Sequence, residues 1–152
     1  MILSISGGVV LEGSSNLDNL VIYTATLSEA SLDPVSFTYR ARSGTADEDT
    51  DFDVTASVIT IPAGLTTFDF SVRTLADNVS EADESVLIDV FNVDGATLAN
   101  GEDRTTVQGV ILDDDGTGLK RAAFVNDAII VEGDSGTKQA VFEIRLSQPS
   151  TE

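Results

Sequence analysis

The strongest constraint on the fold is a run of seven residues in which apolar and polar side chains alternate. Val35, Phe37, Tyr39 and Ala41 fall on one face of an extended chain, and the residues between them fall on the other. A period of two is typical of a half-buried β-strand and does not fit the helical period of 3.6. Similar short apolar segments, divided by turn-forming residues, predict seven strands at 9–11, 20–27, 35–41, 58–61, 68–72, 86–90 and 107–111. The sequence therefore predicts an all-β fold, a seven-stranded antiparallel sandwich of two β-sheets.

The composition narrows the chemistry of the chain. Its 152 residues are enough to bury one core, and 26 acidic against 8 basic residues give a net charge of −18. Such a charge repels nucleic acid, so a nucleic-acid partner is disfavoured. The chain has no cysteine and no histidine, which removes disulfides and the usual zinc ligands. No apolar run is long enough to span a membrane, and oxygen atoms are the donors that remain for a metal.

The acidic residues are concentrated in clusters with few bases nearby. Three consecutive aspartates occupy 113–115, and Arg73 is the one basic residue between Arg42 and Arg104. A second cluster consists of Asp77, Glu81, Asp83 and Glu84. Carboxylates brought together without cationic partners repel one another, so they must spread into solvent, become protonated or recruit a cation. If these acids converge in space, we expect the cation to be calcium, which takes many oxygen ligands.

The order of the strands predicts that these clusters share one end of the sandwich. If successive strands run in opposite directions, strand 9–11 rises to Glu12 and strand 107–111 rises to the aspartates. By the same alternation, the connections 42–57 and 75–84 cross the same end. The connections 29–34, 62–65 and 92–104 cross the opposite end, where acidic residues are less dense.

The connection 42–57 contains alternating aspartates that invite comparison with an EF-hand loop. In a loop starting at Asp47, Phe52 would occupy the invariant glycine position and Val58 the closing glutamate position, so the spacing fails. Asp51, beside the apolar Phe52, is the candidate ligand of this connection. The other three aspartates are expected to lie in solvent: Asp47, Asp49 and Asp53.

The end of the chain repeats its beginning. Residues 130–133 (IVEG) match residues 10–13 (VLEG) at an offset of 120, and Leu146-Ser147 matches Leu27-Ser28 at an offset of 119. A self-similar period of domain size indicates tandem modules. We predict one complete domain at 1–116, a linker at 117–121, and the first strands of an incomplete second repeat at 122–152. Unpaired strands are adhesive, so a dimer formed through residues 122–152 is a further hypothesis.

Four motifs in order resemble the Calx-beta domain family. They are Val10-Leu11-Glu12-Gly13, then Ser43-Gly44-Thr45-Ala46 with Asp51-Phe52, then Glu81-Ala82-Asp83-Glu84, and finally Asp113-Asp114-Asp115. The resemblance spans roughly residues 2–115 and restarts at 122–152. It implies an immunoglobulin-type sandwich that can bind several calcium ions at one end, as in the regulatory segment of sodium/calcium exchangers.

The resemblance also implies a ligand set. The positions that match calcium ligands of the family are Glu12, Asp51, Asp77, the carbonyl oxygen of Val79, Glu81, Glu84, Asp113, Asp114 and Asp115. Ala76 stands where calcium-binding members tend to have a further aspartate, which predicts that one site is weak or missing.

The function expected from these observations is a calcium-binding structural or interaction module of a larger tandem-repeat protein, secreted or displayed at the cell surface. Its partners would be neighbouring Calx-beta repeats of the same chain and a protein or surface at the cell exterior. Two alternatives stay open: an intracellular calcium-sensing regulatory domain and a metal-free adhesive scaffold. A glycosidase with paired carboxylates is disfavoured because the chain has no Trp and two tyrosines, Tyr23 and Tyr39. We therefore expect no enzymatic activity.

Overall fold

A computed structural model describes residues 1–13, 19–115, 123–125, 135–137, 139–140, 142 and 144–146. The chain divides into two units, Met1–Gly116 and Thr117–Glu152. Among the described residues, no helix is long and apolar enough to cross a membrane.

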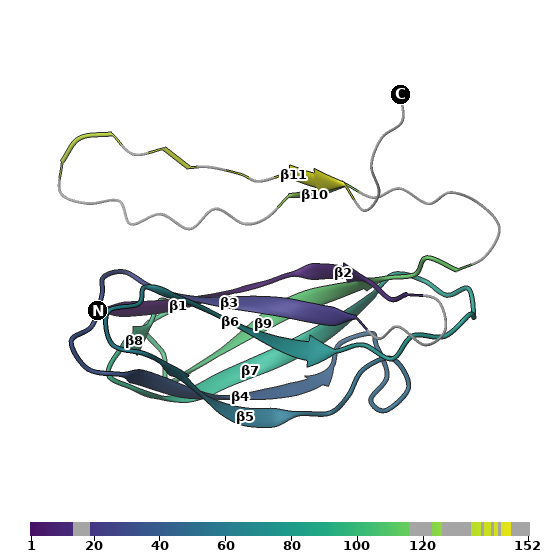
Figure 1. Ribbon diagram of the computed structural model, residues 1–152, viewed down its shortest axis with the longest axis horizontal. Coiled ribbons are helices and arrows are strands. Elements are labelled where there is room, and N and C mark those ends of the chain that lie inside the picture. Colours follow the sequence, from purple (N-terminus) through teal and green to yellow (C-terminus); the bar gives the residue numbers. More distant parts are fainter. Residues whose placement is uncertain are drawn as a thin grey trace. The chain divides into compact units, whose positions relative to one another are not determined.

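The first unit consists of two β-sheets (Figure 1). One sheet has the strand order β6-β3-β1-β8, and the other has the order β2-β9-β7-β4-β5. Within residues 1–13 and 19–115 the strands are β1 (Ile2–Gly7), β2 (Val9–Leu11), β3 (Leu20–Leu27), β4 (Val35–Ser43), β5 (Ala56–Ile61), β6 (Thr67–Arg73), β7 (Glu84–Asp94), β8 (Thr97–Leu98) and β9 (Arg104–Leu112). The all-β sandwich predicted from the sequence is therefore confirmed, and β2 to β7 and β9 correspond to the seven predicted strands.

Two strands, β1 and β8, come in addition to the predicted ones. Strand β1 buries Leu3 and Ile5 and pairs antiparallel with β3 and parallel with the short β8. The chain then crosses to the other sheet, where β2 pairs parallel with β9. The crossing requires a close approach, since a Cβ at Gly7 would collide with the carbonyl oxygen of Gln108. These two parallel pairs depart from the purely antiparallel sandwich that the sequence predicts.

Aromatic rings fill the middle of the sandwich. Phe70 packs against Tyr23, Phe37 and Tyr39, with ring centroids 5.6, 5.5 and 4.9 Å apart. Tyr23 is completely buried and its hydroxyl donates to the carbonyl oxygen of Val86 at 3.1 Å, so its polar atom is paired. Burial raises the pKa of this phenol. Both tyrosines are thus core residues and offer no exposed platform for a sugar.

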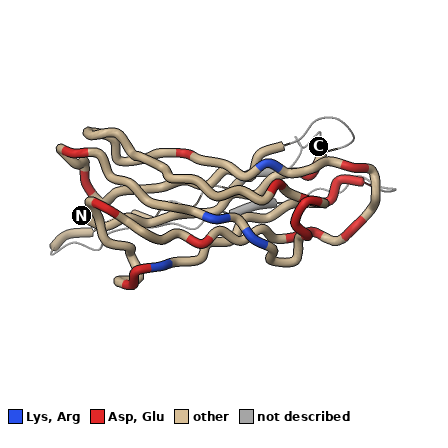
Figure 2. Tube along the Cα trace, turned by 90° about the horizontal axis from the view of Figure 1, so that it is seen from below, with Lys and Arg blue, Asp and Glu red and all other residues tan. Residues whose placement is uncertain are grey.

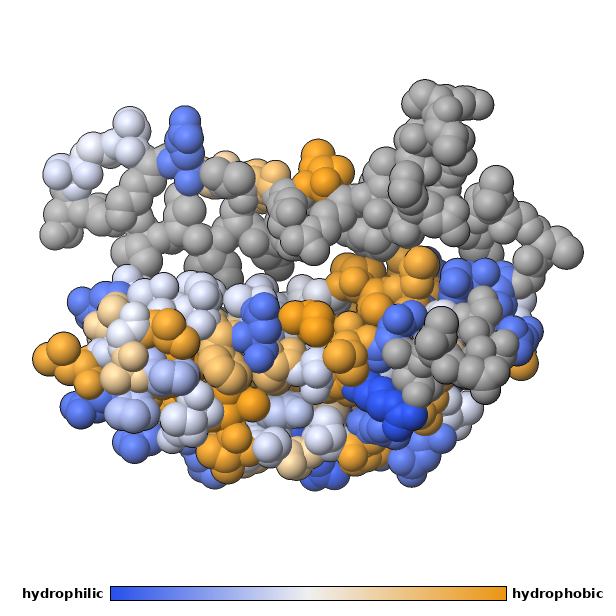
Figure 3. Space-filling model, viewed as in Figure 1, coloured by the Kyte–Doolittle hydropathy of each residue, from blue (hydrophilic) through white to orange (hydrophobic). Residues whose placement is uncertain are grey.

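The outer faces of the sheets carry mixed side chains. On the face seen in Figure 3, hydrophobic and hydrophilic residues are interspersed along the strands. Leu20 and Ile22 of β3 are 49% and 42% exposed. On the five-stranded sheet, Arg42 donates through Nε and Nη2 to the carboxylate of Asp89, which holds the pKa of Asp89 below its ordinary value.

The second unit contains an antiparallel pair, β10 (Ala123–Val125) and β11 (Ile144–Leu146). Its register places Ala123 opposite Leu146, just as Leu3 lies opposite Leu27 in the first unit. The two partners are displaced by 120 and 119 residues, the same offsets that relate the repeated sequence motifs. The first strand pair of the domain therefore recurs here with the same register.

Candidate metal centre

Acidic residues gather most densely at the end of the first unit away from its N-terminus (Figure 2). Strand β2 ends just before Glu12, and β9 ends just before residues 113–115. Because these two strands are parallel neighbours, they deliver their acids side by side, and Glu12 N donates to the carbonyl oxygen of Leu112 at 2.8 Å. The β4–β5 and β6–β7 connections bring in Asp51 and the acids of 75–83.

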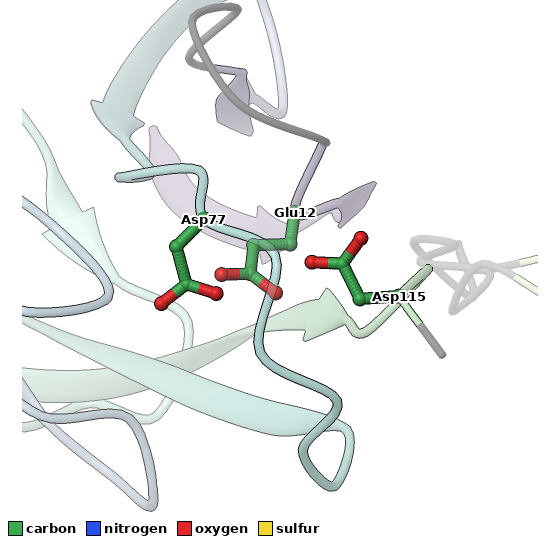
Figure 4. Close-up of side chains that lie close together, drawn as sticks. All are labelled: Glu12, Asp77 and Asp115. Carbon is green, nitrogen blue, oxygen red and sulfur yellow. The ribbon is translucent and has the colours of Figure 1, made fainter. Parts of the chain in front are cut away.

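A first acidic group consists of Glu12, Asp77 and Asp115. One carboxylate oxygen of each lies within 4.8 Å of the others, and Figure 4 shows the three carboxylates pointing towards one another. Glu12 is 4% exposed and Asp115 is 9% exposed. Within the described residues, Oδ2 of Asp115 is a buried oxygen with no hydrogen-bond partner. An unpaired buried oxygen is costly, so this position favours a ligand.

A second acidic group consists of Asp51, Glu81 and Glu84, again with oxygens within 4.8 Å of one another. Asp51 is 6% exposed, Glu84 is half-buried and Glu81 is exposed. The loop before Asp51 folds back on it, since Asp47 N donates to Asp51 Oδ2 at 2.7 Å. The structure thus brings six predicted ligands together in two groups of three.

The electrostatics of both groups disfavour the ionised carboxylates. Burial, followed by the charges of Asp77, Glu81, Asp115 and Asp113, raises the pKa of Glu12 from 4.5 to about 7. Burial, and then the hydrogen bond and charge of Asp51, raise the pKa of Glu84 to about 7. The pKa of Glu81 is also raised, by desolvation and then by the charges of Asp51 and Asp77, one from each group. A bound cation would relieve the repulsion in both groups.

The other predicted ligands lie near these groups but are engaged differently. Asp113 is buried and its Oδ1 accepts a hydrogen bond from Asp115 N at 3.1 Å. Asp114 Oδ1 accepts from Gly13 N at 2.9 Å, at a residue whose φ of +95° suits glycine. Val79 is 57% exposed, and its N–H donates to Asp77 Oδ1 at 2.6 Å. The ligand role of these residues stays a prediction.

Of the three aspartates that are expected to lie in solvent, two are exposed and one is half-buried. Asp47 and Asp49 are exposed. Asp53 instead is half-buried and accepts a hydrogen bond from Arg73 Nη1 at 3.1 Å, because Asp53 N also pairs with the carbonyl oxygen of Arg73 and holds the two residues side by side.

Two uncharged residues at this end were not predicted. Asn19 Nδ2 donates to the carbonyl oxygens of Leu11 and Glu12, at 2.8 and 3.2 Å. Thr74 is completely buried, and its backbone N donates to the carbonyl oxygen of Asn19 at 2.8 Å. The only sequence signal for them is their position, one residue before β3 and one residue after β6.

The donor set suits a hard divalent cation. Its six grouped side chains are all carboxylates, with neither thiol nor imidazole in the chain, and calcium prefers oxygen ligands of this kind. The unpartnered Oδ2 of Asp115 and the raised pKa of Glu12 show that the residues present fit such an ion.

Comparisons with known proteins concern the fold. No family model and no curated protein matches the chain. Among solved structures, the apo form of the Calx CBD1 domain has a TM-score of 0.55 at 27% identity, covering 74% of this chain and 98% of that one. The calcium binding domain CBD12 of CALX1.1 has a TM-score of 0.60 at 26% identity and covers 81% of this chain. CBD12 from CALX1.2 has a TM-score of 0.62 at 22% identity and covers 83%.

The length of these matches differs. This chain spans 54% and 56% of the two CBD12 structures, which contain tandem repeats, but nearly all of the single CBD1 domain. The complete sandwich of the first unit therefore has single-domain counterparts among solved Calx structures. The resemblance read from the four sequence motifs is confirmed, and this chain has the Calx-beta fold.

Proposed function

We propose that this chain is a calcium-binding module that holds calcium ions in the two acidic groups at one end of its sandwich. The observation that carries the proposal is Asp115 Oδ2, a buried oxygen without a hydrogen-bond partner that belongs to the same group as Glu12 and Asp77. Such an atom is destabilising in the cation-free protein and becomes favourable once it binds a metal. The calcium-binding domains with the same fold support the choice of ion.

Each acidic group would hold its own ion. Glu12, Asp77 and Asp115 would hold one ion, and Asp51, Glu81 and Glu84 another. A bound ion supplies positive charge and a demand for six to eight oxygens, which side chains, carbonyl groups and water can satisfy. The chain itself contributes rigidity: parallel strands β2 and β9 fix the main chain on both sides of the first group.

Thermal unfolding of metal-stripped protein tests the proposal. Calcium at a hundredfold excess over its dissociation constant stabilises a one-site protein by about 2.7 kcal/mol, so we expect Tm to rise by roughly 5–10 °C. Magnesium, which demands a smaller octahedral site, should raise Tm less. The variant Asp115→Asn should lose part of the calcium response, while Asp103→Asn, the same change in an exposed residue before β9, should keep it. A calcium response equal to that of magnesium, or none, contradicts the proposal.

We extend the proposal to a structural role in a secreted or surface-displayed array of repeats. The recurrence of the β1–β3 register in β10–β11 supports a second repeat after the first. Asp115 lies in the first acidic group and directly precedes Gly116 and the linker 117–121. Calcium held by Asp115 would therefore fix the point from which the next repeat departs. This is a binding and stiffening role, without catalysis.

Limited proteolysis tests the stiffening. Trypsin can cut the linker after Lys120 and Arg121. Calcium should slow this cleavage in the parent protein and much less in Asp115→Asn. The variant Glu84→Gln, which alters the second group, controls for calcium effects on the protease itself and should still show protection. Equal protection of the parent protein and Asp115→Asn would show that calcium held by Asp115 does not stiffen the linker.

A further inference from the structure

Asn19 and Thr74 form a hydrogen-bonded clamp behind the first acidic group. Thr74 N donates to the carbonyl oxygen of Asn19 at 2.8 Å, and Asn19 N donates to Thr74 Oγ1 at 3.2 Å. The amide of Asn19 then reaches the carbonyl oxygens of Leu11 and Glu12 at 2.8 and 3.2 Å. The clamp therefore ties the main chain of Glu12 to the strand that leads into the loop of Asp77.

The backbone around Thr74 is also paired with the segment that carries Asp51. Thr74 forms an isolated antiparallel bridge with Phe52, the residue after Asp51. On one side of this bridge, Leu75 N donates to the carbonyl oxygen of Asp51 at 2.9 Å. The backbone bonds of this bridge belong to the neighbours of Thr74, since Asp53 N donates to the carbonyl oxygen of Arg73 at 3.0 Å on its other side. The hydroxyl of Thr74 instead donates to the carbonyl oxygens of Asn19 and Glu12, at 3.1 and 3.5 Å.

We propose that Asn19 and Thr74 are positioning residues for calcium at the first acidic group. This inference rests on the proposed calcium-binding function and deepens it. In the cation-free protein, like charges push Glu12 away from Asp77 and Asp115, and burial adds to the cost. Hydrogen bonds to the neighbouring main chain keep Glu12 in place against that repulsion, so the ion meets ligands that are already arranged.

Substitutions at both residues are expected to act on the first acidic group. Asn19→Ala removes the bonds to Leu11 and Glu12 and leaves the Phe52 bridge intact, so it should weaken only the first group. Thr74→Val keeps the shape of the side chain but removes the hydroxyl that accepts from Asn19 N. The same hydroxyl donates to the carbonyl oxygens of Asn19 and Glu12, so its loss should weaken the first group and leave the Phe52 bridge intact. Outer-shell residues of metal sites typically contribute 10–100-fold to affinity.

Calorimetric titration of the metal-stripped full chain with calcium chloride at 20 °C provides the test. We expect Asn19→Ala and Thr74→Val each to weaken calcium binding by about 10-fold, and Thr74→Ser, which keeps the hydroxyl, to restore affinity to within about twofold. Tyr23→Phe is the matched control. It removes a buried hydroxyl bond in the middle of the sandwich, so it should lower Tm and leave calcium affinity unchanged.

Variants that keep only one complete acidic group make the test more specific. In Glu12→Gln, where only the second group is complete, adding Asn19→Ala or Thr74→Val should have no effect on the remaining affinity. In Glu84→Gln, both changes should lower it. The Asn19→Ala pair decides the outcome even where Thr74→Val does not fold.

Three results overturn the inference while leaving calcium binding itself in place: unchanged affinity in folded Asn19→Ala, an equal effect of Asn19→Ala with and without Glu12, or a loss in Tyr23→Phe as large as that in Asn19→Ala. Failure of the parent protein to bind calcium is a different result, since it overturns the proposed function and this inference together.

Discussion

The middle of the sandwich and its acidic end differ in the side chains that they bury. In the middle, packed rings surround Tyr23, whose single buried polar atom has a partner in Val86. At the acidic end lies every buried polar or charged residue found among the described positions: Glu12, Asp51, Thr74, Asp113 and Asp115. Acidic side chains are rarely buried unless they are paired or bind a metal. The difference indicates that the middle of the sandwich stabilises the fold, whereas the acidic end is suited to a cation.

The largest effect should come from damage to the middle alone. Phe37 is completely buried and meets Phe70 edge-on at 5.5 Å. Phe37→Ala should lower the free energy of unfolding by about 3–5 kcal/mol, because it removes buried apolar surface and leaves a cavity. The rise in Tm on adding calcium should stay the same, as measured by thermal unfolding with and without the ion. A smaller calcium increment in the variant would show that the two regions are not independent.

The reverse experiment removes a charge from the acidic end. Glu12→Gln should stabilise the metal-stripped protein by about 1–2 kcal/mol, since a neutral amide avoids the burial cost and repulsion that raise the pKa of Glu12. In calcium the same variant should be less stable than the parent. Urea unfolding in both conditions gives the two values. Glu102→Gln, an exposed position, should change neither. Destabilisation of the metal-free variant would mean that Glu12 stabilises the fold as a charge.

The pH dependence of stability should separate the two regions without mutation. Glu12 and Glu84 titrate near pH 7 in the folded protein, against an ordinary value of 4.5. Between these values the folded state binds more protons than the unfolded state. The contribution of these two groups to stability is therefore fully present below about pH 4.5 and is lost as pH rises through about 7. Asp89, with its lowered pKa, stays ionised throughout this window and contributes no slope.

Thermal unfolding of metal-stripped protein between pH 5 and 8 measures this slope. We expect Tm to fall by roughly 5 °C or more as pH rises, and the fall to be reduced in Glu12→Gln. With calcium present the trend should reverse, because protons compete with the ion below pH 7. A metal-free Tm that rises with pH would contradict the raised pKa values on which the comparison depends.

Much of this architecture could be predicted because it depends on local sequence pattern and on the alternating direction of successive strands. The alternation in β4 is visible in its own residues, and counting strand directions brings Glu12, Asp51 and Asp115 to one end without any knowledge of contacts. The crossing at Gly7 is not evident from the sequence, because Leu3 and Ile5 alone are too short an apolar pattern to indicate a strand.

Hydrogen bonds between residues far apart in the sequence could not be predicted from local pattern or strand direction. Asn19 and Thr74 are 55 residues apart and uncharged, so neither composition nor spacing distinguishes them from loop residues. Likewise, three consecutive aspartates look equivalent in the sequence, yet Asp114 accepts from Gly13 while Asp115 keeps an unpartnered oxygen. Such differences depend on where each side chain points after the strand has ended.

The smallest effect should come from an aspartate only two residues outside the second acidic group. Asp49 is exposed, with a φ of +64° that asparagine also tolerates, whereas Asp51 is 6% exposed and belongs to the group. Asp49→Asn should change stability by less than about 0.5 kcal/mol and leave calcium affinity nearly unchanged. The same substitution at Asp51 should weaken calcium binding strongly in a calorimetric titration. If Asp49→Asn weakened binding as much as Asp51→Asn, the alternating aspartates of this loop would act together as ligands, and the boundary drawn here between solvated and grouped acids would be wrong.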